Sequence, residues 1–210
     1  QARAMYEQTV VLAHEIGHPY SLGFALYAAT ACYQSHRDSV MVSRLADALH
    51  TLGTQHGYGH TVLQSSFMRG WVMAGSEQAE DGLALMENTL AARRRTGALL
   101  SMQLLLSSLA ERYIEHGKLD RAQACVDEAL ALMSEYGERI GAAQVLRVQA
   151  EIRRRQTRGS CIEFELDSGP DDLLLRAIDI ARCQQAGELE FQAVLCLCRY
   201  WKNQGNQEEA

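Results

Sequence analysis

The sequence predicts an all-α fold, a right-handed superhelical solenoid of helix hairpins with a period of about 40 residues. The clearest hairpin pattern lies in residues 99–137, which read as two helices joined by a tight turn. The period follows from Gly17, Gly57, Gly97 and Gly137, which stand 40 residues apart. Glycine can take the positive φ that ends a helix, so each of these residues is expected to close one. The composition agrees, since the 210 residues include only two prolines and are 47% hydrophobic.

The hairpin at 99–137 explains why such units would stack. Its turn falls at residues 116–118, and the small side chains of Ala110 and Ala122 stand where the two helices approach most closely. Tyr113 is expected to fill the space beside them. A small residue recurs at the same place in the first helix of the other hairpins, namely at Ala29, Gly70, Ala150 and Cys198.

Taken in order, the chain divides into a single array of repeats over residues 1–210. The expected units are a partial repeat at 1–17, full repeats at 18–57, 58–97, 98–137 and 138–187, and a partial repeat at 188–210. The last full repeat contains an insertion, 158–169, in which apolar residues alternate with acidic ones between 162 and 166. This period of two predicts an extended flap. Pro170 then opens the next helix at a position that tolerates proline.

The first and last units are incomplete hairpins, so we expect the chain to be part of a longer protein. The apolar faces at the two truncated ends would then lack a neighbouring helix. Exposed apolar faces promote association, and the ends are therefore expected to allow a homodimer.

Composition excludes several classes of function. The formal charge of −6 argues against nucleic-acid binding, because phosphate contacts need a positive field. The longest mostly apolar run, 97–110, carries three serines and a glutamine and is too short to span a bilayer. The six cysteines form no C-x-x-C pair, which favours buried free thiols in a reducing compartment. We expect a cytoplasmic protein that does not contact membranes.

Residues 14–18 match the H-E-x-x-H pattern, which in metalloproteases places two histidines on one helical face to hold zinc. Here Gly17 is expected to end the helix between them. Pro19 also disfavours a helical conformation at His18. The pattern is therefore interpreted as a loop at a repeat boundary rather than as a metal site.

Other catalytic patterns are missing from the sequence. It contains no G-x-x-x-x-G-K-[ST] phosphate loop, no G-x-G-x-x-G after a strand and no G-x-S-x-G elbow. His56 and His60 are separated by two glycines and are not expected to share a metal ion. We therefore expect no catalytic residue, no metal, no cofactor and no enzyme activity in this chain.

Two runs of arginine admit more than one interpretation. Residues 93–95 close a helix just before Gly97, where cations complement the helix dipole, so a solvated helix end is expected rather than a binding patch. Residues 153–155 and Arg158 coincide with the insertion and its acidic segment 163–165. We expect these arginines to pair with that segment, and an anionic ligand is the alternative.

The pattern A-x-x-Y-x-x-x-G-x-x-x-x-A at 110–122 resembles the core of tetratricopeptide repeats, although a period of 40 residues is longer than their usual ~34. Residues 14–29, 69–71 and 177–210 are similar to the C-terminal helical region of large bacterial signalling proteins. Those proteins join an adenylate/guanylate cyclase-like or DNA-binding domain to a P-loop ATPase module and then to this superhelix. The resemblance implies a sensor or scaffold arm, with the nucleotide chemistry in domains outside this chain.

The functional surface of such an array is normally the concave groove lined by the first helices. Projection from the small position gives the inward candidates, which are Gln64, Phe67, Trp71, Leu104, Ser107, Glu111, Gln144, Arg147, Glu151, Gln192, Leu195 and Arg199. Phe67 and Trp71 would act as apolar anchors, whereas Arg147 and Arg199 would pair with acidic groups of the partner. Because the stacking contacts lie elsewhere, changes at Arg147 are expected to alter thermal stability little.

These observations predict a non-catalytic protein-interaction or sensory arm of a larger bacterial signal-transduction protein, an ATPase, a cyclase or a transcriptional regulator. Its groove would bind a peptide, a protein or another domain of the same chain. The alternative is a small-molecule inducer receptor with a deep pocket between Trp71 and Arg147.

Overall fold

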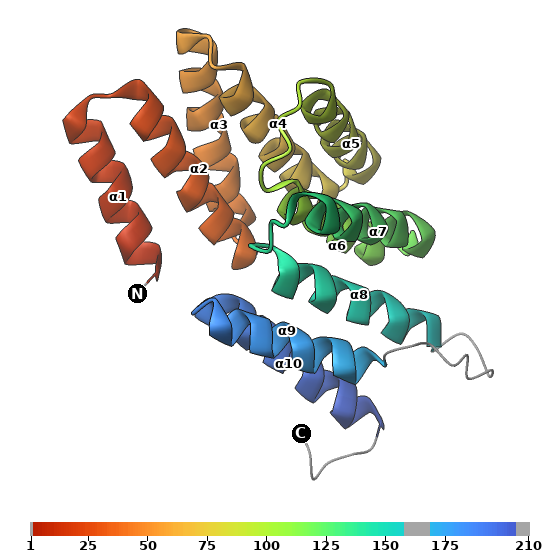
Figure 1. Ribbon diagram of the computed structural model, residues 1–210. Helices are drawn as coiled ribbons and strands as arrows, with labels where there is room; N and C mark the ends of the chain where they lie inside the picture. The colour runs from red at the N-terminus through yellow and green to blue at the C-terminus, as the bar shows by residue number, and fades with distance from the viewer. Residues whose placement is uncertain (1, 158–168, 205–210) are drawn as a thin grey trace. The chain divides into compact units, whose positions relative to one another are not determined.

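The computed structural model describes residues 2–157 and 169–204, and within these residues it contains ten helices and no strand (Figure 1). The prediction of an all-α fold is thereby confirmed. The helices belong to two compact units, Gln1–Leu99 and Leu100–Ala210, which we call unit 1 and unit 2.

Unit 1 is a series of five helices in which each helix packs on the next along the chain (Figure 1). They are α1 (Ala2–Ile16), α2 (Pro19–Ser35), α3 (Ser39–His56), α4 (Gly59–Ala74) and α5 (Ala79–Arg95). In addition α2 contacts α4, so α3 packs against two helices that touch each other. Buried residues recur at helical spacing, as in α3 at Val42, Ala46, Leu49 and Gly53, because one face of the helix must meet its neighbours.

Unit 2 has the same order of packing. Its helices are α6 (Met102–Glu115), α7 (Leu119–Tyr136), α8 (Ala142–Thr157), α9 (Pro170–Cys183) and α10 (Gly187–Gln204). The first helices of its hairpins form one layer, since α8 contacts both α6 and α10. The second helices bridge that layer, with α7 against α6 and α8, and α9 against α8 and α10. Pro170 begins α9 as predicted, and its first turn carries two aspartates that complement the helix dipole.

The core of unit 2 between α8, α9 and α10 is built from small and aliphatic side chains. Its buried members are Leu146, Ala150, Leu173, Leu174, Ala177, Ile178, Ala193 and Leu197. Trp201 of α10 packs against this cluster while remaining partly exposed. Alanines in the cluster allow the helix backbones to approach, as the small-residue pattern predicted for Ala150.

The four glycines from which the period was predicted all have positive φ. The angle is 68° or 69° at Gly17, Gly57, Gly97 and Gly137, and it is 70° at Gly117 in the hairpin turn. This conformation costs other L-residues energy because their Cβ crowds the backbone. The prediction that these glycines close helices is confirmed, for example at Gly57, which caps the end of α3.

The backbones of α4 and α5 approach each other closely where the two helices cross. A Cβ added to Gly70 would lie 2.9 Å from the carbonyl oxygen of Gly82, and one added to Gly82 would lie 2.2 Å from the nitrogen of Ala74. Both contacts are with backbone atoms, which cannot move aside as a flexible side chain does. The small residue predicted at Gly70 is therefore required by the crossing of these two helices.

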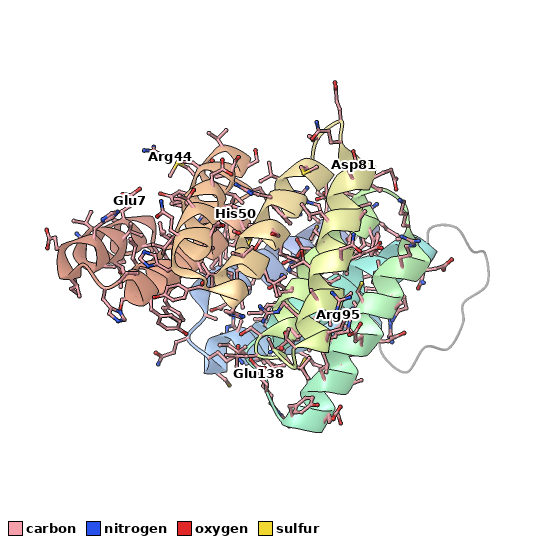
Figure 2. The ribbon with its side chains drawn as sticks, turned by 90° about the horizontal axis from the view of Figure 1, so that it is seen from above. Glu7, Arg44, His50, Asp81, Arg95 and Glu138 are labelled. Atoms are coloured by element: carbon pink, nitrogen blue, oxygen red, sulfur yellow. The ribbon has the colours of Figure 1, made fainter. Side chains whose placement is uncertain are left out.

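Loops tie neighbouring hairpins of unit 2 together. The carboxylate of Glu138, labelled in Figure 2, accepts a hydrogen bond from the backbone N–H of Ser101 at 3.2 Å. The side-chain amide of Gln184 donates to the carbonyl oxygen of Arg139 at 2.8 Å. The first bond connects the residues before α6 to those before α8, and the second connects the end of α9 to the residues before α8. Both satisfy backbone groups near helix ends.

Some predictions fall on residues that the structure does not describe. The flap predicted at 158–169 lies outside the described residues except for Gly169, and so do residues 205–210 of the last partial repeat. Among the described helices, none combines the length and the apolar character needed to cross a bilayer.

Candidate functional site

In unit 1 the predicted groove residues are largely inaccessible. The side chains of Phe67 and Trp71 are only 0% and 4% exposed, and Gln64 is half-buried. The prediction that the two rings act as accessible anchors is wrong. The reason is that α4 contacts α2, α3 and α5. The side of α4 that was predicted to line the groove is therefore used for packing against these helices.

In unit 2 most of the predicted residues keep part of their surface. Ser107 is the exception, since it is fully buried and its hydroxyl donates to the carbonyl oxygen of Gln103 at 2.7 Å. Leu195 and Arg199 are exposed. The others are half-buried, namely Leu104, Glu111, Gln144, Arg147, Glu151 and Gln192. We call these eight residues the α6–α8–α10 face, since they lie on the three packed first helices.

An ion pair lies at the centre of the α6–α8–α10 face. The guanidinium of Arg147 on α8 donates to the carboxylate of Glu111 on α6, and the two side chains are only 15% and 18% exposed. Arg147 also interacts with the thiol of Cys196 on α10. Burial by itself lowers the pKa of Arg147, but the charge and hydrogen bond of Glu111 and the contact with Cys196 outweigh it and raise the pKa. The three first helices are thus joined through one cation.

This geometry corrects the role predicted for Arg147. Its charge is compensated by Glu111 of the same chain rather than held ready for an acidic partner. It also takes part in packing, so the expectation that it matters little for stability does not agree with its burial. Cys196 was not predicted, and the sequence signal for it was weak, because it is one residue away from the projected position Leu195.

A second charged cluster lies one turn further along α8. Glu151 accepts hydrogen bonds from Arg154 at 2.6 and 2.7 Å and from Arg155 at 2.8 Å, and Arg155 also donates to the carbonyl oxygen of Ile114 at 2.9 Å. Burial raises the pKa of Glu151, but the hydrogen bonds and charges of the two arginines outweigh it and lower the pKa. The acidic segment 163–165 expected to pair with residues 153–155 and Arg158 lies outside the described residues, whereas Arg154 and Arg155 pair with Glu151.

The arginine run at the end of α5 divides into different environments. Arg95, labelled in Figure 2, is exposed as predicted, whereas Arg93 is only 2% exposed. Arg93 continues the buried stripe of Met86 and Leu90, and its Nη1 lies 3.5 Å from Nδ1 of His60. Burial and the charge of Arg93 both lower the pKa of His60. The prediction of a solvated helix end is therefore wrong for Arg93.

The H-E-x-x-H residues do not share a helix. The first helix stops at Ile16, Gly17 has positive φ, and His18 is extended with φ −94° and ψ 109°. The ring nitrogen of His18 accepts a hydrogen bond from the backbone N–H of Ser21 and so caps α2. His14 and His18 therefore lie on different helices, and the described residues contain no group of three His, Cys, Asp or Glu side chains placed to hold a metal.

A serine and a histidine meet in unit 1, where the sequence had suggested no such pair. Nδ1 of His50, labelled in Figure 2, lies 3.1 Å from the hydroxyl oxygen of Ser65. The hydroxyl donates to the carbonyl oxygen of Val62 at 2.8 Å, so its oxygen is left to accept from the imidazole. Ser65 is fully buried. The bond therefore joins α3 to α4 rather than activating a nucleophile.

Exposed aromatic residues gather elsewhere in unit 1, at positions that the groove projection did not select. Tyr20 and Phe24 on α2 are 61% and 70% exposed. The Tyr20 ring meets the Tyr58 ring edge to face with centroids 5.9 Å apart, and the His56 ring stacks on Tyr58 at 5.6 Å. A signal was present in the sequence, because Tyr58 directly follows the helix-ending Gly57 and Tyr20 stands three residues after the helix-ending Gly17.

No protein-family model matches the chain, and no curated protein matches it either. The resemblance carried by residues 14–29, 69–71 and 177–210 therefore stays a prediction. What the chain can do is argued below from its own side chains.

Proposed function

We propose that the chain is a non-catalytic protein-interaction or sensory arm of a larger cytoplasmic signal-transduction protein in bacteria. In this proposal its hairpins continue one another as a right-handed, tetratricopeptide-like solenoid with a period of about 40 residues. Support comes from the equally spaced glycines with positive φ and from the same order of helix packing in both units. Any ATPase or cyclase chemistry would reside in domains outside this chain.

The observation that carries this proposal is the α6–α8–α10 face. Three neighbouring first helices present polar side chains that are half-buried, with Leu195 and Arg199 exposed at one edge. Arg147 at the centre of the face is already neutralised by Glu111, so the face carries no strong charge there. It offers half-buried polar side chains next to the exposed, apolar Leu195. This combination suits a peptide or a protein segment that buries an apolar residue on Leu195 and pairs an acid with Arg199.

The test is site-specific photo-crosslinking in the native cell. A photoreactive phenylalanine analogue replaces Leu195 on the α6–α8–α10 face or, as the matched control, the exposed Arg176 on α9. We expect a discrete crosslinked partner from position 195 and none from position 176. A probe at position 192 should capture the same partner. The double change Leu195→Glu and Arg199→Glu should then abolish the adduct formed at position 192. Equal adducts at the face and at the control position would contradict the proposal.

A further inference from the structure

Three exposed rings of unit 1 and the half-buried Tyr58 make up what we call the unit 1 aromatic surface, defined as Tyr20, Phe24, His56 and Tyr58. Tyr20 and Phe24 are one helical turn apart on α2, and the ring contacts described above join Tyr20 to Tyr58 and Tyr58 to His56. Large aromatic rings that remain exposed forgo the free energy of burial. Two strongly exposed rings one helical turn apart, beside the Tyr20–Tyr58 and Tyr58–His56 ring contacts, mark a surface suited to association.

The segments that build this surface carry no formal charge. Residues 16–36 and 48–68 contain no aspartate, glutamate, lysine or arginine, although 22% of the chain is charged. The centres of protein interfaces combine these two features, enrichment in aromatic residues and depletion of charge. The partner that fits such a surface is uncharged, because an acidic or basic segment would lose hydration without gaining an opposite charge.

The surface also offers hydrogen-bond donors. Within the described residues, the hydroxyls of Tyr20 and Tyr58 and the ring nitrogens of His56 bond to no other protein group. A partner that supplies acceptors as well as apolar rings would therefore use both properties of the surface. An α-helix is a poor match, since its carbonyl groups are already bonded within the helix.

We propose that the unit 1 aromatic surface docks a proline-rich segment in the polyproline II conformation. Such a segment has no internal hydrogen bonds, so its carbonyl oxygens are free to accept from the tyrosine hydroxyls. Its pyrrolidine rings are uncharged and pack on exposed aromatic faces, the arrangement used in other recognition of proline-rich peptides. The Tyr20 ring, which is 61% exposed and meets Tyr58 edge to face, offers an aromatic surface on which such a ring can pack. This surface is made of residues of unit 1, whereas the α6–α8–α10 face is made of residues of unit 2, so the two proposals are tested with different variants.

The test uses the whole chain and a fluorescein-labelled decaproline peptide, with binding followed by fluorescence anisotropy. We expect saturable binding that Tyr20→Ala and Phe24→Ala each weaken by at least about tenfold, the scale of an aromatic hot spot. Tyr58→Phe keeps the ring and loses the hydroxyl, and it should weaken binding by about three- to tenfold. Tyr136→Ala is the matched control, because Tyr136 is 57% exposed but lies in unit 2, and it should leave the affinity unchanged.

Further measurements make the outcome decisive. The affinity should change by less than about twofold between low and high salt, since no formal charges meet. Circular dichroism of each variant establishes that the fold is intact, and Tyr20→Leu provides a second variant that keeps an apolar side chain. The proposal is overturned if decaproline does not bind at about 1 mM, if an uncharged amphipathic helical peptide binds more tightly, or if Tyr136→Ala weakens binding as much as Tyr20→Ala. It is also overturned if the surface pairs two copies, seen as self-association that Tyr20→Ala abolishes.

Discussion

At the scale of single residues, removing only one partner of the Glu111–Arg147 ion pair is expected to destabilise the fold strongly. Replacing Glu111 by glutamine keeps the shape but leaves the cation of Arg147 half-buried without its carboxylate. We expect the free energy of unfolding to fall by about 3 kcal/mol, because an uncompensated charge away from water is costly. The measurement is urea denaturation followed by circular dichroism.

Two further variants test that explanation of the Glu111→Gln result. Adding Arg147→Met removes the orphaned charge and should recover part of the lost stability. Asp47→Asn breaks the pair with Arg69, in which the carboxylate side chain is 61% exposed, and should change stability by less than about 0.5 kcal/mol. Equal losses from Glu111→Gln and Asp47→Asn would show that burial does not matter at this site.

Glu151 should make the stability depend on pH. Its pKa is lower in the folded chain than the ordinary value of 4.5, so its deprotonated form is favoured by folding. A group of this kind stabilises the fold above its ordinary pKa, and the contribution is lost as the pH falls through the lower folded value. The difference in unfolding free energy between the wild type and Glu151→Gln should therefore be largest near neutral pH and shrink below about pH 4.5. A difference independent of pH would contradict this assignment.

At the scale of the helices, the crossing of α4 and α5 depends on the absence of a side chain at Gly82. In Gly82→Ala the new Cβ would lie 2.2 Å from the Ala74 nitrogen and 2.7 Å from the Gly70 carbonyl oxygen. The helices would have to separate, and we expect a loss of about 3 kcal/mol in unfolding free energy. Thermal and urea denaturation measure it.

The matched control for Gly82→Ala lies at the start of α4. A Cβ at Gly59 would meet nothing within 4 Å, and its φ is not in the left-handed region. Gly59→Ala should therefore be neutral or stabilise the protein by about 0.5 kcal/mol, because alanine restricts the unfolded chain. If both substitutions destabilise equally, the close helix approach is not the cause.

At the scale of the whole molecule, the exposed apolar residues of α1 should promote self-association. Met5, Leu12 and Ile16 are all exposed and lie at i, i+7 and i+11 on one face of the helix. We expect the sedimentation coefficient to rise with protein concentration, and Leu12→Lys with Ile16→Lys to suppress the rise. Val40→Lys on α3 changes an even more exposed apolar residue outside this face and should have no effect. A chain that stays monomeric at high concentration would exclude this contact.

The sequence by itself determined the features that depend on local backbone chemistry. Gly17, Gly57 and Gly137 end helices wherever the rest of the chain goes, because positive φ is cheap for glycine and costly for other residues. The spacing of small and apolar residues likewise predicted the all-α class and the close approach at Gly70, since one face of each helix must be buried.

Only the tertiary structure decided which face of a helix remains accessible. Phe67 and Arg93 look like an anchor and a solvated cation in the sequence, yet both are buried. Phe67 lies on α4, which packs against α2, α3 and α5, and Arg93 lies on α5, which packs on α4 and brings its guanidinium next to His60. The partner of Arg147 was equally hidden, since Glu111 is 36 residues away along the chain and comes within reach only when α6 packs on α8. Helical periodicity shows which face of a helix is most apolar. Exposure and ion pairing depend instead on which other helices pack against it in the folded chain.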